Sequence, residues 1–262
     1  MTSEGRRRLQ PVFDFLITLV VWAYFTAGFV LLFAPFYLWA GIFSKNREQS
    51  FQRLNSRFYR GLFFLVRRVM PGHRWDIRPE VRGIRSSVIV CNHRSYLDSI
   101  LLISLYEKHN TIVKSRLFDI PFFGRMLQWS GYIPSSAEGR FADMMIQRLE
   151  RMDAFLADGG NLIVFPEGTR SLNGSLGRFN KGAFKIARSC RAPISVLFIR
   201  NTDRMFRRGS FSFDTLGPNT IRLERIGRID QAAAARETGS VSHVMATVRE
   251  MLELKNNGGG DA

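Results

Sequence analysis

Cysteine and acidic side chains are scarce in this 262-residue sequence. The two cysteines, Cys91 and Cys190, lie far apart in apolar or basic surroundings, which excludes a disulfide scaffold and indicates a reducing compartment. No group of Cys and His residues has zinc spacing, so we expect neither a metal site nor a redox cofactor. No helix-turn-helix, zinc-finger or RNA-binding signature is present, so nucleic acid is not an expected partner.

Basic residues are abundant, and the charge balance is extreme. The chain has 38 Lys and Arg against 22 Asp and Glu, a formal net charge of +16. This excess implies an anionic partner, such as an acidic membrane surface or a phosphorylated or thioester-carrier substrate. Hydrophobic residues make up 45% of the chain and include 23 Phe, which suffices for one domain of good size with an appendage.

Residues 15–44 contain no charged side chain, a stretch longer than the roughly 20 residues that a membrane span needs. Pro35 interrupts the stretch and should kink or end a helix there. Basic residues at 6–8, Lys45 and Arg47 flank both ends, so the distribution of charge gives no clear orientation. Two arrangements stay open, a single tilted span and a monotopic anchor in one leaflet. A buried pair of core helices fits the length less well.

Residues 47–70 have the pattern of a basic amphipathic helix that lies on an anionic bilayer. An ordinary solvated helix is the alternative. We therefore expect residues 1–70 to form membrane-anchoring helices. The apolar positions recur at steps of three and four and are Phe51, Leu54, Phe58, Leu62, Leu65 and Val69.

Strand and helix patterns alternate from residue 71 to 255, which predicts an α/β domain with a mostly parallel or mixed sheet flanked by helices. Residues 256–262 are too poor in apolar groups to fold and are expected to be a disordered tail. Strands are expected at 86–91, 111–114, 131–133, 161–165, 194–199, 210–214 and 219–226. Helices are expected at 96–107, 121–129, 139–157, 179–189 and 240–255.

A histidine and an aspartate stand where one of these strands meets a helix. Residues 87–91 read as a buried strand, and residues 99–105 read as a helix. His93 and Asp98 lie between them, at the kind of strand end where α/β sheets bind ligands. A carboxylate five residues after a His can hold one imidazole nitrogen and leave the other as a base. The alternative is a purely structural role, in which His93 caps the strand and Asp98 starts the helix.

A second buried strand, 161–165, also runs into a polar loop, 166–171. Gly168 allows the backbone to approach a ligand closely, and Arg170 can form a fork of hydrogen bonds with a phosphate or carboxylate. By itself this loop also fits an ordinary turn with a surface ion pair.

Together, the sequence Asn-His-x4-Asp at 92–98 and the sequence Phe-Pro-Glu-Gly-Thr-Arg-Ser at 165–171 resemble the glycerolipid (lysophospholipid) acyltransferase family, which includes the 1-acylglycerol-3-phosphate acyltransferases. Weaker matches lie at 114–124 and 177–194, so the resemblance covers roughly residues 85–200. It implies transfer of an acyl group from acyl carrier protein or coenzyme A to the hydroxyl of a lysolipid. The thioester is then a co-substrate and no cofactor is implied.

The resemblance also implies roles for particular residues. His93 is the general base on the lipid hydroxyl, and Asp98 orients and stabilises its imidazole. A direct attack by the lipid hydroxyl needs no nucleophile from the protein, although Cys91 and Ser95 leave a covalent acyl-enzyme open. The expected substrate-binding residues are Asn92, Lys114, Glu167, Gly168, Thr169 and Arg170.

One departure from the family concerns the acceptor. Many members have an Arg, thought to hold the acceptor phosphate, at the position that Ala137 occupies here. Either Lys114, Arg140 or Arg170 replaces it, or the acceptor is another lysolipid, such as a lyso-amino-acid lipid. A catalytically silent lipid-binding relative is a further alternative. We expect a membrane location, with the catalytic domain on the cytoplasmic face of a bacterial inner membrane.

Overall fold

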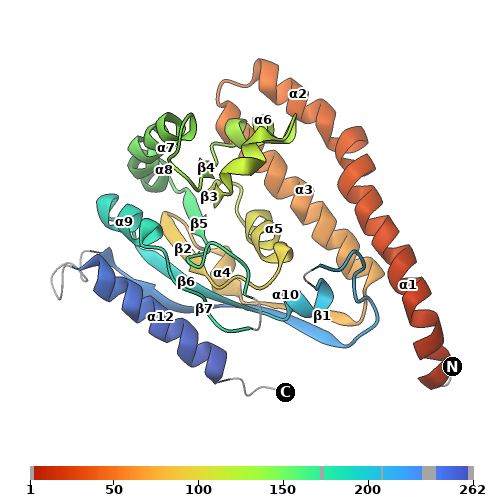
Figure 1. Cartoon of the computed structure of the whole chain (residues 1–262). Coiled ribbons are helices and arrows are strands. Elements are labelled where there is room, and N and C mark those ends of the chain that lie inside the picture. Colours follow the sequence, from red (N-terminus) through yellow and green to blue (C-terminus); the bar gives the residue numbers. More distant parts are fainter. Residues whose placement is uncertain (1–2, 172–173, 208, 232–239, 259–262) are drawn as a thin grey trace.

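The computed structural model describes residues 3–171, 174–207, 209–231 and 240–258, with side chains from Gln10 onward. A seven-stranded sheet forms its centre, in the order β1-β7-β6-β2-β5-β3-β4 (Figure 1). The strands are β1 (His73–Ile77), β2 (Ser87–Cys91), β3 (His109–Val113), β4 (Ile133–Pro134), β5 (Asn161–Val164), β6 (Ile194–Arg200) and β7 (Asn219–Ile229).

The sheet is mixed, as the sequence predicts. Strands β6, β2, β5, β3 and β4 are parallel neighbours, whereas β7 runs antiparallel to β6. Every residue of β2 and β5 is buried, which explains why both read as continuous apolar runs rather than alternating ones. Because the parallel strands point the same way, their carboxyl ends meet at one edge of the sheet.

Helices cover both faces of the sheet (Figure 1). One face packs against α3 (Arg47–Val69) and α5 (Tyr96–Leu105), and the other against α8 (Met152–Ala157), α9 (Gly182–Ser189) and α12 (Val241–Asn257). The remaining helices of the α/β domain are α4 (Pro79–Arg82), η2 (Ser115–Asp119), α6 (Phe123–Trp129), α7 (Phe141–Glu150) and α10 (Thr202–Met205).

The N-terminal apolar stretch is one long helical segment. It comprises α1 (Ser3–Ala23), the π-helix η1 (Tyr24–Phe33) and α2 (Ala34–Phe43), and α3 then returns alongside it (Figure 1). Pro35 was expected either to kink the helix or to end it. The second alternative is wrong, because the helix continues to Phe43. Pro35 lies in the first turn of α2, directly after the π-helix, where the hydrogen-bond ladder is already rearranged.

This helical segment contacts the rest of the molecule along most of its length. Near its start, Asp14 accepts hydrogen bonds from the backbone N–H and hydroxyl of Thr215. Further along, the Tyr37 hydroxyl bonds Asn55, and Gly41 lies against the Trp129 ring. Its opposite side is exposed and apolar, with Leu16, Val20, Val30, Leu31, Leu38, Trp39, Ile42 and Phe43 at the surface.

Several details differ from the expectations. The single helix expected at 139–157 is two helices, α7 and α8, separated at Arg151. Residues 210–214 form no strand, because side chains of α1 and the loop itself take their backbone N–H groups, as Thr18 does for Phe213. Strand β1 was not foreseen, because its sequence, HRWDI, is polar and it lies at the sheet edge. The expected tail begins too early, because Asn256 and Asn257 belong to α12, while residues 259–262 lie outside the described residues.

Candidate active site

His93 and Asp98 meet at the carboxyl end of β2. The Nδ1 atom of His93 lies 3.0 Å from Oδ2 of Asp98, whose side chain is fully buried. The same oxygen accepts the backbone N–H groups of Arg94 and Ser95 at 2.6 and 2.7 Å. Asp98 closes the capping box at the start of α5, with Ser95 as N-cap. Local helix capping therefore fixes the carboxylate that holds the imidazole.

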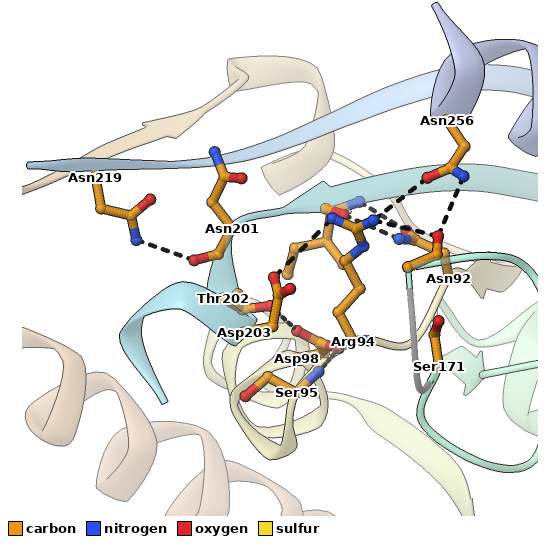
Figure 2. A network of polar contacts seen from close by, with 12 residues as sticks. Asn92, Arg94, Ser95, Asp98, Ser171, Asn201, Thr202, Asp203, Asn219 and Asn256 are labelled. Carbon is orange, nitrogen blue, oxygen red and sulfur yellow. Dashed lines mark hydrogen bonds and ion pairs between the residues drawn. The ribbon is translucent and has the colours of Figure 1, made fainter. Parts of the chain in front are cut away.

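Thr202 completes the set of donors to this carboxylate. Its hydroxyl donates to Oδ1 of Asp98 at 2.5 Å, and both side chains are fully buried (Figure 2). Thr202 starts α10, directly after β6, which is the strand next to β2 in the sheet. Asn201 precedes it in a left-handed conformation, with φ of 65°, and is held by Asn219 of β7. Sequence analysis did not predict this contact, because the two partners are 104 positions apart in the chain.

The imidazole of His93 is oriented on its flat side as well. It stacks on the ring of Phe165 with the ring centres 4.2 Å apart. Its side chain is 14% exposed, so the ring is largely covered but not sealed. Because Asp98 occupies Nδ1, Nε2 is the nitrogen left for a substrate hydroxyl, and no described residue bonds it.

Glu167 joins the two loops that the sequence singled out. Its Oε1 accepts the backbone N–H of His93 at 3.1 Å, and its Oε2 accepts that of Gly177 at 2.8 Å. A third link runs from the N–H of Ser171 to the carbonyl of His93, at 2.8 Å. The buried carboxylate therefore positions the histidine loop against the 166–171 loop, which is a structural use beside the expected contact with substrate.

Arg170 stands beside the His93–Asp98 pair. Its guanidinium lies 3.5 Å from the centre of the Tyr96 ring, a cation–π contact with the residue two before Asp98. Gly168 has φ of +65°, a conformation that ordinary side chains rarely adopt, and this turn directs the chain toward Arg170. Thr169 is exposed between them. A partly exposed arginine, half-covered by an aromatic ring, suits an anionic ligand.

Asn92 and Lys114 lie at the same edge of the sheet but differ in surroundings. Asn92 is buried, and its amide both donates to and accepts from the backbone of Ile199, at 2.9 and 2.8 Å. It therefore ties the end of β2 to β6 rather than facing a ligand. Lys114 is exposed and follows β3, which is separated from β2 only by β5. Arg140 forms an ion pair with Asp119, so it is partly neutralised.

The two residues that left a covalent intermediate open are both inaccessible. Cys91 is fully buried, and burial raises the pKa of its thiol well above the usual value. Ser95 is also buried, and its hydroxyl donates to the carbonyl of Phe206. The geometry therefore favours direct attack by a substrate hydroxyl. Within the described part of the chain, no three His, Cys, Asp or Glu side chains gather as a metal site would require.

The last helix also reaches this site. Arg94, next to His93, donates to the carbonyl of Gly174 at 3.3 Å and to the side chain of Asn256 at 3.4 Å. Asn256, near the end of α12, donates to the same carbonyl at 3.1 Å (Figure 2). The residue expected to lie in a disordered tail thus holds the loop that follows Arg170.

Comparisons with known proteins identify the family that this chain resembles. Residues 76–200 match the family model described as Acyltransferase. The chain is 34% identical over 146 residues to the chloroplastic 1-acyl-sn-glycerol-3-phosphate acyltransferase BAT2 of Brassica napus, covering 54% of this chain and 42% of that protein. It is 29% identical to 1-acyl-sn-glycerol-3-phosphate acyltransferase alpha of Homo sapiens, covering 71% of this chain and 69% of that protein.

A solved structure shares the fold. The 1-acyl-sn-glycerophosphate (LPA) acyltransferase PlsC from Thermotoga maritima superposes with a TM-score of 0.70 at 20% identity, covering 95% of this chain and 98% of that chain. The chain spans less than half the length of the plant relative, so the likeness there is that of a domain. Residues 76–200 therefore form a domain of the acyltransferase family, and the relatives that match this chain are named 1-acyl-sn-glycerol-3-phosphate acyltransferases.

Proposed function

We propose that this protein transfers a fatty acyl group from a thioester to the free hydroxyl of 1-acylglycerol-3-phosphate, giving phosphatidic acid. One observation carries the proposal, namely the hydrogen-bonded His93–Asp98 pair beside Arg170 at the carboxyl edge of the sheet. The names of the relatives favour this acceptor over other lysolipids.

The reaction follows from the positions of the side chains. Nε2 of His93 takes the proton of the acceptor hydroxyl as its oxygen bonds the thioester carbonyl carbon. Asp98 stabilises the imidazolium that forms, through the 3.0 Å hydrogen bond to Nδ1. The carbon–sulfur bond then breaks, and the leaving thiolate takes the proton from Nε2. Every proton and electron pair is accounted for without an enzyme nucleophile or a bound cofactor.

Arg170 is the cation that we assign to the acceptor phosphate, in place of the arginine missing at Ala137. Its guanidinium has no carboxylate partner among the described residues, whereas Arg140 is paired with Asp119. Lys114 lies at the same edge of the sheet and is assigned a supporting role. A fork of hydrogen bonds to a phosphate is about twice as strong as neutral ones, so Arg170 is suited to fix the acceptor near His93.

We infer that the N-terminal helices lie in one leaflet rather than crossing the bilayer. A span needs about 20 residues free of the soluble domain. The helix has 34 suitable residues, Gln10–Phe43, but contacts with the catalytic domain recur from Asp14 to Gly41. The stretches of helix between successive contacts are therefore too short to cross the bilayer. The exposed apolar side would then enter the cytoplasmic leaflet of the inner membrane, with the catalytic domain in the cytoplasm.

A donor-by-acceptor panel tests the proposal. The purified protein is offered palmitoyl thioesters of coenzyme A and of acyl carrier protein, each with 1-acylglycerol-3-phosphate or with a lyso-amino-acid lipid, and products are read by mass spectrometry. We expect phosphatidic acid from at least one donor. Product only from the lyso-amino-acid lipid moves the assignment to that acceptor. No product from any pair supports a silent lipid-binding relative.

A further inference from the structure

The segment that follows the 166–171 loop contains basic side chains and no acidic ones. Between Glu167 and Asp203 there is no Asp or Glu in the sequence. One other long basic run without an acid lies between Glu48 and Asp76, mostly on α3, and it belongs to the opposite face of the sheet. The cations of this segment are Arg170, Arg178, Lys181, Lys185, Arg188, Arg191 and Arg200.

Five of these cations form one exposed surface, which we call the α9 surface. It consists of Arg178, Lys181, Lys185, Arg188 and Arg191, all exposed on α9 and its flanks. None of the five takes part in an ion pair with a described residue, although cations elsewhere, such as Arg148 with Glu48, do. Unpaired like charges held close together repel one another, so the surface is stabilised by an anionic partner.

The α9 surface adjoins the catalytic histidine through a short chain of hydrogen bonds. The N–H of Asn180 donates to the carbonyl of Pro166 at 2.8 Å, and the N–H of Gly177 donates to Glu167. Glu167 in turn accepts the N–H of His93. The amino-terminal end of the α9 surface, at Arg178 and Lys181, therefore lies on the side of the reacting centre, where an acyl donor must bring its thioester, whereas Arg191 leads into the start of β6 at the opposite edge of the sheet.

The bilayer is a poor candidate for this partner. α9 packs on the face of the sheet that α12 and α8 cover, whereas α1 and α3 belong to the core on the other face. Figure 1 shows α9 on the opposite side of the sheet from α1 and α2. If the apolar side of α1 and α2 lies in the membrane, the α9 surface is turned toward the aqueous phase.

The extent of the surface argues for a protein rather than a free cofactor. The eight residues of α9 span about 12 Å, and cations continue beyond both ends, at Lys181 and Arg191. Coenzyme A carries its phosphates together at one end, where a few convergent donors suffice, whereas a row of cations along a whole helix complements the acidic face of another protein. We propose that the α9 surface docks an acidic carrier protein that presents the acyl thioester to His93. This rests on the proposed acyl transfer.

The test reverses charge on the surface and compares two donors. Lys185→Glu/Arg188→Glu removes four units of charge from α9 without touching the catalytic loop. A matched control, Arg74→Glu/Arg82→Glu, makes the same charge change on exposed residues of β1 and α4, which pack with the core on the other face of the sheet. Each protein is assayed with palmitoyl thioesters of acyl carrier protein and of coenzyme A, and 1-acylglycerol-3-phosphate, at low and high salt.

With the carrier-protein donor, the α9 variant should lose about tenfold in kcat/KM at low salt, and its salt dependence should flatten. With the coenzyme A donor, its kcat/KM should change less than twofold, as should both reactions of the control. Equal loss with both donors, or no loss with either, overturns the docking proposal.

Further results distinguish carrier docking from the proposed acyl transfer and from membrane binding. A wild-type enzyme that accepts only the coenzyme A donor overturns docking and leaves the acyl transfer intact. Failure with both donors refutes the acyl transfer itself. Weaker sedimentation of the α9 variant with phosphatidylglycerol vesicles, with unchanged carrier kinetics, assigns the surface to the bilayer instead.

Discussion

Thr202 offers a test of the hydrogen-bonded chain Thr202–Asp98–His93, which we call the relay, at a residue that contacts no substrate. Replacing Thr202 by Val keeps the shape of the side chain and removes the hydroxyl that donates to Oδ1 of Asp98 at 2.5 Å. Thr202 is the one described donor to that oxygen, whereas Oδ2 keeps its three. A hydrogen bond to a charged group is worth ~1.5–3 kcal/mol. If all of it is expressed in the transition state, kcat falls by about 10- to 100-fold.

The assay measures kcat and KM for phosphatidic acid formation, together with the melting temperature. We expect kcat to fall in Thr202→Val with KM for the acceptor little changed, because Thr202 acts through Asp98 and not on the lipid. Thr202→Ser keeps the donor and should recover most of the rate. In a His93→Ala background the valine should cost nothing further, since the relay is already absent. A kcat within twofold of wild type in Thr202→Val would refute the reasoning.

Other consequences are equally direct. Arg170→Gln should raise KM for 1-acylglycerol-3-phosphate by about tenfold or more, through loss of a charge-assisted contact, while an unchanged KM assigns the phosphate to another cation. Burial lowers the pKa of His109 to about 4, so the unfolded state, with a pKa near 6.5, binds more protons between these values. Stability should therefore be complete above about pH 6.5 and fall by ~3 kcal/mol as pH drops to 4. Thermal melting across this range should show the loss, and His109→Gln should flatten it. Single cysteines at Gln10 and Lys45, in a Cys190→Ser background, should react with an impermeant thiol reagent from the same side of the membrane. Labelling from opposite sides means that the helix spans.

The parts of the site that consist of residues close together in the chain could be predicted from the sequence. The strand end, the following helix and the His93–Asp98 pair lie within one stretch of chain, where residue spacing suffices, although the capping box at Ser95 was not predicted. The buried strands β2 and β5 and the mixed sheet also follow from continuous apolar runs.

Contacts between distant segments escaped prediction. Thr202 reaches Asp98 only because β6 lies next to β2 in the sheet. The order of strands in a sheet cannot be predicted from the sequence of either segment alone. Asn256 reads as part of a polar tail, yet the helix before it ends beside Gly174. Glu167 was expected to face substrate, but both its oxygens accept backbone N–H groups whose positions depend on the folded loops. Tertiary placement gave these polar side chains their partners.

The most direct measurement concerns the base itself. His93→Ala and wild-type protein are purified in detergent, matched in melting temperature, and offered the palmitoyl thioester that the wild type prefers with 1-acylglycerol-3-phosphate. A positioned histidine contributes roughly 10²–10⁴-fold to the rate, so phosphatidic acid formation by the variant should fall at least a hundredfold. A folded His93→Ala protein that forms phosphatidic acid at the wild-type rate would contradict the account.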